Sequence, residues 1–343
     1  MEKVIDFYKK MRKKKALQRD YTGKYAFVGI GNHSLNNLYP VIDYLKIPLK
    51  YIVCKSESSA MLVDRNYAGV VGTADYACVL NDPEVRGVFI CASPLAHFDL
   101  TKKAMESQKN VFTEKPVCLS SDELQQLIDV EKTNKAICAV GMQKRFSTCT
   151  TLLLHKLKKQ KVISYNYRFH VGAYPEGNAI WDIFIHPVDL ACFLFGEAEL
   201  VSMLKTTQDS GRTSIFLHLK HKNAVIGTLE LSTQYAWSQA SETLSVNTET
   251  GIFEMKDHLA LTFSEKPKSL FSIPTEKILP EIPEVQILFN GNNFLPTFGN
   301  NQIVSQGFFG EIQHFVSLCE NKSTKNNASL PSLENTYKIL QQI

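Results

Sequence analysis

The sequence lacks long apolar runs, closely spaced cysteine pairs and a strong excess of one charge. No stretch approaches the ~20 consecutive apolar residues that a membrane-spanning helix needs, so we expect no membrane partner. No Cys-x-x-Cys motif occurs among the eight cysteines, which argues against a zinc knuckle or a thioredoxin-type redox pair. Scattered cysteines in a chain of 343 residues are typical of reduced, buried side chains and predict a cytoplasmic protein without a metal site.

The charged residues are nearly balanced, because 38 Lys and Arg stand against 34 Asp and Glu and give a net charge of +4. The positive excess is strongest in residues 1–22, which we interpret as a basic N-terminal arm. No apolar segment follows the run from Lys9 to Lys15, so we do not expect a secretory signal. Such a run can contact nucleic acid, but it is more often a solvated helix face, and we expect no nucleic-acid partner. Apolar residues at helical spacing allow the arm to pack on the body or on a partner subunit: Val4, Ile5, Tyr8 and Met11.

Residues 23–141 contain strands that alternate with helices, the pattern of a doubly wound parallel sheet. The first strand leads into Gly29-Ile30-Gly31-Asn32-His33-Ser34 and then a helix, the order that a dinucleotide-binding fingerprint requires. Gly29 would make the tight turn, and Gly31 would let a pyrophosphate approach the backbone at the helix N-terminus. Ser34 stands where glycine or alanine is usual. The motif is therefore incomplete, and alone it is also compatible with any tight strand–helix turn.

The second strand, Leu49 to Cys54, ends without the acidic residue that usually binds the ribose of NAD. The chain continues as Cys54-Lys55-Ser56 instead. Lys55 and Ser56 are able to bind a phosphate, and no carboxylate at this point would repel one. The sequence therefore predicts NAD(P) as cofactor and slightly favours NADP(H).

Two later strands of this domain end in polar motifs. The strand from Val85 to Ala92 is followed by Ser93-Pro94-Leu95-Ala96-His97, and the strand from Asn110 to Thr113 by Glu114-Lys115-Pro116. Proline ends a strand and keeps the preceding residue extended, so Lys115 would lie at the carboxyl end of a strand, where open α/β sheets bind ligands. Taken alone, this lysine is also compatible with an exposed side chain at a strand exit.

Residues 142–343 differ in character from the first domain. Alternating apolar and polar residues in neighbouring segments predict an α+β domain with a large, mostly antiparallel open sheet. The expected strands are 162–171, 214–220, 224–232 and 243–247. One helix is expected over residues 178–195 with Gly196 as its C-cap, and two more over 306–319 and 333–343.

The helix over residues 178–195 carries Asp182, His186 and Asp189 among apolar residues. The first two are four residues apart and share a helix face, and burying such groups is costly unless they are paired or functional. One alternative is a buried histidine paired with either aspartate. A metal site is a third interpretation, but a single histidine without other ligands nearby in the sequence gives it little support.

Together these motifs resemble the Gfo/Idh/MocA oxidoreductase family, which includes glucose–fructose oxidoreductase and inositol dehydrogenases. The sequence departs from the family pattern at Ser34, after the second strand, and in its basic arm. The matching pieces occur in the family's order from about Tyr25 to Gly196: Gly29-Ile-Gly31, Ser93-Pro94-Leu-Ala-His97, Glu114-Lys115-Pro116, Arg145-Phe146 and Asp182-x-x-x-His186-x-x-Asp189.

The resemblance implies a Rossmann domain and then a substrate-binding and oligomerisation domain. It also implies hydride transfer between a nicotinamide and a hydroxyl-bearing carbon of a sugar, cyclitol or nucleotide sugar. Lys115, Asp182 and His186 are the catalytic group on this basis. A hydroxyl that loses hydride also loses its proton, so a base is needed; histidine suits that role, and a lysine cation stabilises the oxygen. The sequence leaves open whether Lys115 or His186 transfers the proton.

The motifs and the resemblance together give the other expected site residues. Cofactor binding is expected from Gly29, Gly31, Asn32, His33, Ser34, Lys55, Ser56, Ser93, Pro94, His97, Glu114 and Lys115. Substrate binding is expected from Arg145, Tyr167, Trp181 and Asp189. A homodimer or homotetramer through the C-terminal sheet is also implied. Two alternatives stay open: a non-catalytic nicotinamide-binding sensor or regulatory protein, and a sugar lyase or hydrolase that recycles its cofactor on the same scaffold.

Overall fold

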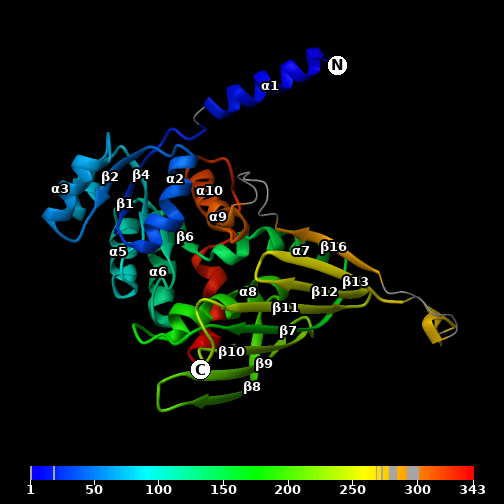
Figure 1. Ribbon diagram of the computed structural model, residues 1–343. Helices are drawn as coiled ribbons and strands as arrows, with labels where there is room; N and C mark the ends of the chain where they lie inside the picture. Colours follow the sequence, from blue (N-terminus) through cyan, green and yellow to red (C-terminus); the bar gives the residue numbers. More distant parts are fainter. Residues whose placement is uncertain (1, 18–19, 268, 272, 278–283, 292–300) are drawn as a thin grey trace.

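The protein is built around two β-sheets that differ in strand direction (Figure 1). The computed structural model describes residues 2–343 apart from 18–19, 268, 272, 278–283 and 292–300. One sheet has six parallel strands and the other has eight strands that are mostly antiparallel. The predicted fold class, a Rossmann domain followed by an α+β domain with a large open sheet, is confirmed.

The parallel sheet has the strand order β3-β2-β1-β4-β5-β6. Its strands are β1 (Lys24–Val28), β2 (Leu49–Val53), β3 (Val71–Thr73), β4 (Val85–Ile90), β5 (Asn110–Glu114) and β6 (Cys138–Gly141). The central strands are buried along nearly their whole length because helices cover both faces, which explains their continuous apolar runs. The chain reverses its direction of strand addition between β1 and β4, and ligands bind at such a point in sheets of this kind.

The helices of this domain begin where the strands end. They are α2 (Tyr39–Tyr44), α3 (Glu57–Asn66), α4 (Tyr76–Asn81), α5 (Pro94–Glu106) and α6 (Ser121–Asn134), and a π-helical turn, Ser34–Leu38, precedes α2. Side-chain caps define several starts: Ser56 accepts from the Ser59 N–H, and Ser120 accepts from the Glu123 N–H. The N-termini of α3, α5 and the Ser34 turn therefore all face the carboxyl edge of the sheet.

The larger sheet has the order β16-β13-β12-β11-β7-β10-β9-β8, and only β7 and β10 run parallel within it. Its strands are β7 (Val162–His170), β8 (Ala198–Thr207), β9 (Thr213–His221), β10 (Ile226–Ser232), β11 (Ser241–Thr248), β12 (Gly251–Lys256), β13 (Ala260–Glu265) and β16 (Val285–Asn290). Two-residue strands β14 (Ser269–Leu270) and β15 (Ile273–Pro274) pair separately, before a short 3-10 turn, Thr275–Lys277. Buried and exposed residues alternate along β9 and β12, so one face of the sheet is covered and the other is open.

The remaining helices after β6 come from three parts of the chain and lie against one or the other sheet. They are the 3-10 turn Gln143–Phe146, α7 (Thr148–Leu157), the π-helical turn Ile180–Phe184, α8 (Ile185–Phe195), α9 (Gln302–Ser305), α10 (Phe308–Cys319), the 3-10 turn Leu330–Leu333 and α11 (Glu334–Leu340). The single helix expected over residues 178–195 is thus a π-helical turn followed by α8. It ends at Gly196, whose φ of 88° is readily adopted only by glycine.

Helix α10 crosses back to the parallel sheet (Figure 1). Its Phe315 ring lies 5.1 Å from the Phe89 ring of β4 and is fully buried. Gly307 and Gly310 allow the start of α10 to pack closely, because a Cβ on Gly307 would collide with the Gln143 carbonyl and one on Gly310 would lie 2.9 Å from the Phe146 Cβ. The C-terminal part of the chain therefore completes the core of the first domain.

The basic N-terminal segment forms helix α1 (Glu2–Leu17), which projects away from the body (Figure 1). Every described side chain from Lys3 to Arg12 is exposed, Val4 to 71%, so these residues do not pack on the body of the same chain. All eight cysteines are free thiols. Of the helices that the structure describes, none has the combined length and apolar character that crossing a bilayer requires.

Candidate active site

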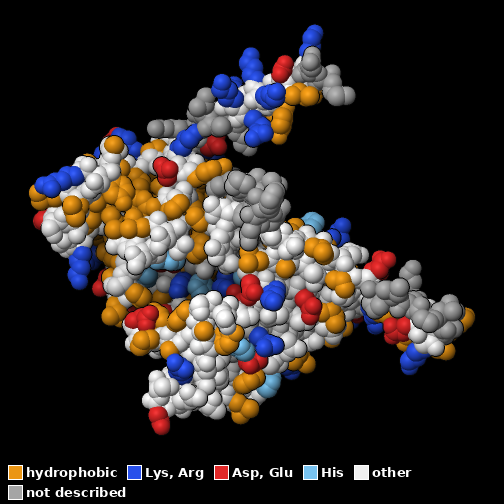
Figure 2. Space-filling view, viewed as in Figure 1, with side chains coloured by type: hydrophobic (Ala, Val, Ile, Leu, Met, Phe, Trp, Pro, Cys, Tyr) orange, Lys and Arg blue, Asp and Glu red, His pale blue; other side chains and the backbone are white. Residues whose placement is uncertain are grey.

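A cavity of approximately 1030 Å³ opens at the carboxyl edge of the parallel sheet. It is lined by residues that follow β1, β2, β4 and β5, and so lies at the reversal point between β1 and β4. Figure 2 shows a recess between the two domains with Lys or Arg and His side chains along its floor. The N–H groups at the helix starts around this edge favour an anionic ligand.

The glycine turn after β1 has the geometry of a backbone cradle. Gly29 has a φ of 95°, and a Cβ there would collide with the Cys91 carbonyl oxygen, so only glycine fits. A Cβ on Gly31 would meet no atom within 4 Å, because this residue faces the open cavity. A pyrophosphate can therefore approach the Gly31 backbone. These features fit a dinucleotide.

Ser34 replaces the usual third glycine without disturbing the turn. Its side chain is fully buried, and its Oγ lies 2.9 Å from both the N–H and the carbonyl oxygen of Gly31. Nearby, Asn37 Nδ2 lies 3.1 Å from His33 Nδ1, and His33 Nε2 lies 3.1 Å from Glu114 Oε1. His33 thus links the glycine turn to the end of β5. Asn32 also lines the cavity.

The end of β2 offers a cation and hydroxyls but no carboxylate. Lys55 and Ser59 line the cavity beside Cys54. Ser56 caps α3, and its Oγ also lies 3.0 Å from Ser59 Oγ, so the hydroxyl predicted to bind cofactor is engaged in holding the helix start. Of the described residues that line the cavity, Glu114 is the one carboxylate.

The segment after β4 brings Ser93, Pro94 and His97 to the cavity wall. The His97 ring is buried, with Nδ1 at 2.8 Å from the Pro116 carbonyl oxygen and Nε2 at 3.0 Å from the Ala92 carbonyl oxygen. Burial lowers the pKa of His97, although both carbonyl oxygens act against the shift. This histidine therefore ties the ends of β4 and β5 together, so its ring is engaged by the protein itself.

Lys115 projects from the end of β5 toward the second domain. Its Nζ donates a hydrogen bond to the main-chain carbonyl of Asp182, and its N–H donates to Glu114 Oε2 at 3.2 Å. Burial lowers the pKa of Lys115, and the negative charges of Glu114 and Asp182 partly oppose the shift. A half-buried lysine at the wall of this cavity suits a role at a reacting oxygen.

Asp182 meets Lys115 through its main chain, while its carboxylate has other partners. Oδ2 accepts the Asn178 N–H at 3.0 Å at the start of the π-helical turn. The i, i+4 argument assumed an α-helix here, but residues 180–184 are π-helical, which changes the angular relation between Asp182 and His186. The carboxylate thus holds the N-terminal end of this segment.

His186 is buried, with 8% of its surface exposed, and within the described part of the chain its Nδ1 has no hydrogen-bond partner. Burial, followed by the charges of Lys115 and Lys144, lowers its pKa well below the usual value. The imidazole is therefore neutral near pH 7. A neutral, unpaired ring nitrogen next to a lysine is able to accept a proton.

Arg145 and Asp189 pair with each other. Arg145 Nε donates to Asp189 Oδ2 at 2.8 Å, and both side chains are almost completely buried. Arg145 Nη1 also donates to the Asn327 carbonyl and to Ser332 Oγ, each at 2.8 Å. The two residues expected in the substrate pocket instead join the end of β6, helix α8 and the C-terminal segment.

Tyr167 and Trp181 have different positions. The Tyr167 hydroxyl is fully buried and donates to Glu242 on β11. Trp181 is half-buried, and its ring centroid lies 5.1 Å from that of Tyr337. Tyr167 thus belongs to a polar cluster behind the site, whereas Trp181 packs against α11.

Sequence reasoning missed the centre of that cluster. Glu242 forms an ion pair with Lys144 and lies 3.0 Å from His258 Nε2. Burial acts to raise the pKa of Glu242, but the charges of Lys144 and His258 win and lower it strongly. Lys144 and Glu242 are 98 residues apart, so no local pattern pairs them. Among the described residues, no group of three His, Cys, Asp or Glu side chains is arranged to hold a metal ion.

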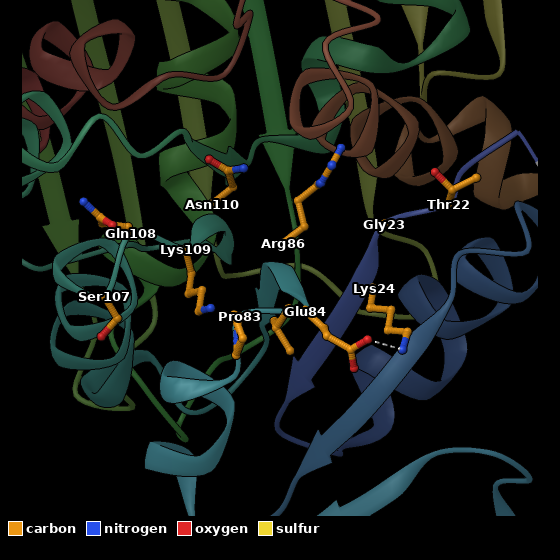
Figure 3. Close-up of a pocket in the computed structure, with 11 residues that line it drawn as sticks. Thr22, Gly23, Lys24, Pro83, Glu84, Arg86, Ser107, Gln108, Lys109 and Asn110 are labelled. Atoms are coloured by element: carbon orange, nitrogen blue, oxygen red, sulfur yellow. Dashed lines mark hydrogen bonds and ion pairs between the residues drawn. The ribbon is translucent and has the colours of Figure 1, made fainter.

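A second cavity, of approximately 630 Å³, lies at the opposite, amino edge of the same sheet (Figure 3). Lys24 Nζ and Glu84 Oε1 are 2.9 Å apart there, as the dashed line in Figure 3 marks, and Lys109 Nζ donates to the Asp82 carbonyl at 2.6 Å. Arg86 points away from Glu84 in this view and donates to the Cys319 carbonyl at 3.4 Å. The charged side chains of this cavity are therefore already paired.

Two family descriptions match the chain. Residues 23–142 match the oxidoreductase family with an NAD-binding Rossmann fold, Gfo/Idh/MocA, and residues 159–254 match the Gfo/Idh/MocA C-terminal domain. Among curated proteins, the scyllo-inositol 2-dehydrogenase (NAD(+)) of Bacillus subtilis (strain 168) is 31% identical over 135 residues, and the inositol 2-dehydrogenase of Salmonella typhimurium is 28% identical over 131 residues. Each match covers 36% of this chain and 39% of the relative, so the chain matches about two fifths of their length.

Solved structures resemble the whole chain. A dehydrogenase from Chromobacterium violaceum superposes with a TM-score of 0.80 at 18% identity, covering 94% of each chain. A 3-ketoreductase from Actinomadura kijaniata, in complex with TDP-benzene and NADP, has a TM-score of 0.72 at 14% identity and covers 94% of this chain and 96% of that one. An oxidoreductase from Agrobacterium radiobacter, in complex with NAD+, L-tartaric acid and magnesium, has a TM-score of 0.75 at 14% identity, with coverage of 93% and 94%. These likenesses establish the fold.

Proposed function

This chain belongs to the Gfo/Idh/MocA oxidoreductase family, and from its site we propose that it is an NAD(P)-dependent dehydrogenase or reductase. It would transfer hydride between a nicotinamide and a hydroxyl-bearing carbon of a sugar, cyclitol or nucleotide sugar. One observation carries the proposal: Lys115, whose charge acts on the neutral His186, lines a cavity whose Gly31 cradle is open to a dinucleotide. The names of the inositol dehydrogenases support the class of substrate.

The division of roles follows from the two side chains. The bound nicotinamide would supply the site that takes up or releases hydride. His186 would accept the hydroxyl proton on its neutral imidazole ring, which makes no hydrogen bond at Nδ1 in the described structure. Lys115 would donate a hydrogen bond to the same oxygen and stabilise its developing negative charge. Asp182 would contribute through its carbonyl, which receives the Lys115 Nζ hydrogen bond and so sets the position of the ammonium group.

We propose NADP(H) as the preferred cofactor. Lys55 and Ser59 line the cavity at the end of β2, and residues 54–56 contain no acid that would bind the ribose 2′-hydroxyl or repel a 2′-phosphate. The proposal now rests on Lys55 and Ser59, because Ser56 is engaged as the helix cap. A Lys55→Glu variant should reverse the cofactor preference toward NADH. An unchanged preference would show that Lys55 does not bind the 2′-phosphate.

We further propose that the open face of the large sheet forms a homodimer or homotetramer. Exposed apolar side chains lie on several of its strands, among them Ile163 on β7, Phe216 on β9, Ile226 on β10 and Ile252 on β12. A Phe216→Lys/Ile226→Lys double variant should reduce the mass measured by light scattering. An unchanged mass would show that another surface, or none, joins the subunits.

The first test is a fluorescence titration with NADPH and NADH, after the absorbance of the purified protein has been recorded. Binding of NADPH, followed by turnover of a sugar or cyclitol that is lost in Lys115→Met, is the expected result. Binding of neither cofactor would overturn the proposal. Cofactor already bound after purification would favour the recycling lyase or hydrolase, and binding without turnover of any sugar-like compound would favour the sensor.

A further inference from the structure

Helix α10 carries a buried carboxyl group that the proposed reaction does not use. Glu311 is 2% exposed, and among the residues that the structure describes neither of its carboxyl oxygens has a hydrogen-bond partner. It lies on the first turn of α10, which Gly307 and Gly310 hold tightly against residues 143–147. Burying an ionised carboxylate without a partner is strongly unfavourable, so a neutral acid is the form that this position accepts.

Glu114 is the neighbouring charge that acts on Glu311. Burial and then the negative charge of Glu114 raise the pKa of Glu311 well above its usual value. For Glu114 itself, burial acts to raise the pKa, but the hydrogen bond and charge of His33, together with Lys115, lower it. The two opposite shifts favour an ionised Glu114 and a neutral Glu311, so that one of the two buried carboxyl groups carries a proton.

The ionised member of the pair is the one attached to the dinucleotide turn. Glu114 Oε1 lies 3.1 Å from His33 Nε2, and His33 belongs to the Gly29–Ser34 turn that faces the cavity. The His33 ring also meets Phe308 edge-on, with ring centroids 5.7 Å apart, and Phe308 stands three residues before Glu311 on α10. Phe308, which is far from His33 in the sequence, is thereby placed next to the Gly29–Ser34 turn.

We propose that Glu311 is a positioning residue of the dinucleotide site. It holds the proton of the carboxyl pair, and so keeps Glu114 ionised and in place as the acceptor for His33. This inference rests on the proposed function, since it concerns how firmly NAD(P)(H) is held. Loss of the proton would place a second negative charge next to Glu114 and disturb its contact with His33, which would weaken binding at high pH.

Other ionisable groups surround the pair and must be separated from it in the test. Burial and then the charges of both carboxyl groups raise the pKa of Cys91, which lies in the segment after β4. The charges of Lys115 and His97 act to lower the pKa of Glu114. His33 comes from the turn after β1, and His314, on α10 itself, accepts from the Asn327 N–H at 3.1 Å. Variants of Glu311 alone leave all of these groups in place.

The experiment measures the dissociation constant of NADPH from about pH 6 to about pH 10. The parent should bind at least about 10-fold more weakly at the alkaline end, because ionisation of Glu311 opposes binding. Glu311→Gln keeps the shape of the neutral acid but has no proton to lose, so the ratio of its alkaline to neutral dissociation constants should stay close to one. Glu131→Gln is the matched control: burial also raises the pKa of Glu131, but its Oε1 accepts the Cys138 N–H and lies outside the cofactor cavity. This control should keep the alkaline loss of the parent.

A double variant tests whether Glu311 acts through Glu114. In a Glu114→Gln background, adding Glu311→Gln should produce no further change in the pH profile, since the partner charge is already gone. An alkaline loss of the same size in the parent and in Glu311→Gln would overturn the inference, and so would a parent profile without any alkaline loss.

Failure of the inference is separable from failure of the proposed function. If the parent binds neither NADPH nor NADH, the proposed function fails, and infrared titration still tests the proton on Glu311. The C=O stretch of a protonated carboxylic acid should be present in the parent near neutral pH and reduced in Glu311→Gln. Its absence from the parent would overturn the inference independently of cofactor binding.

Discussion

The two edges of the parallel sheet carry cavities built from the same strands, yet the buried polar groups near them differ. At the amino edge, Lys24 pairs with Glu84, and Lys50 Nζ lies 2.5 Å from Asp82 Oδ2, whose pKa is lowered to about 2 by that hydrogen bond. At the carboxyl edge, the lining groups Glu114 and Lys115 are also paired, but behind them His186 Nδ1 and the Glu311 carboxyl are buried without partners in the described structure.

A cavity becomes a candidate site when polar groups near it are not all satisfied by partners within the protein. The helices that follow the strands begin at the carboxyl edge, so N–H groups and positive helix ends face one cavity only. The lysines of the amino edge are paired with carboxylates or carbonyl oxygens, and an exposed pair such as Lys24 and Glu84 contributes little to stability. The first three predictions below each compare a residue at or near one edge with a residue of the other, and the fourth concerns His186 alone.

The largest expected effect is that of removing the Lys115 ammonium group. Lys115→Met should lower kcat/KM by about 10³-fold, because the cation that stabilises the reacting oxygen is lost. Lys24→Met, at the amino edge, should leave kcat/KM close to that of the parent. The rates are measured with whichever sugar or cyclitol the parent oxidises. A decrease in kcat/KM of less than about 10-fold in Lys115→Met would show that Lys115 does not stabilise the reacting oxygen.

The buried ion pair next to the carboxyl edge should dominate stability. Asp189→Ala leaves the Arg145 guanidinium buried without its carboxylate and should lower the free energy of unfolding by about 3 to 5 kcal/mol. Glu84→Ala removes an exposed partner of Lys24 and should shift the urea midpoint far less. Equal shifts would mean that Arg145 finds other acceptors, such as the Asn327 carbonyl that it already contacts.

Adding one methyl group distinguishes the two cavities by cofactor affinity. A Cβ on Gly31 projects into open space, so Gly31→Ala should fold normally but bind NADPH about 10- to 100-fold more weakly, since the pyrophosphate loses its approach to the backbone. Gly23→Ala, whose Cβ would lie 3.0 Å from Arg86 Cδ at the amino edge, should bind NADPH as the parent does. Normal affinity in Gly31→Ala would place the pyrophosphate elsewhere.

The smallest expected effect is a change in the pH dependence of stability. The pKa of His186 is lower in the folded protein than its value of ~6.5 in the unfolded chain, so below that pH the unfolded state binds more protons and stability falls as pH falls. His186→Asn removes this contribution, and its free energy of unfolding should fall less steeply with acid, by at most about 1.4 kcal/mol per pH unit. Identical slopes in urea titrations would show that His186 is not buried as a neutral ring.

The local features of the site were predictable because they depend on neighbouring residues. The glycine turn and the β5 strand ending in Glu114-Lys115-Pro116 each follow from a few consecutive side chains. The alternation in residues 214–220 predicted a strand with one covered face, and β9 has one.

The partners of the predicted residues were not accessible from sequence patterns. Lys144 and Glu242 come from the end of β6 and from β11, and Glu311 comes from α10, so their juxtaposition depends on how the two sheets and the last helices pack. Whether Arg145 and Asp189 face a substrate pocket depends on where their side chains point, which the sequence pattern does not give. In the structure the two side chains point toward each other.

The sequence by itself determined which residues stand at the carboxyl ends of the strands, and so the edge of the candidate site, because glycine, proline and apolar runs act within a few residues. Only the tertiary structure decided the protonation state and freedom of the site's groups. Burial and the distance to a charge from another segment set these properties, as they do for His186 between two lysines and for Glu311 beside Glu114. Those distances exist only once the chain has folded.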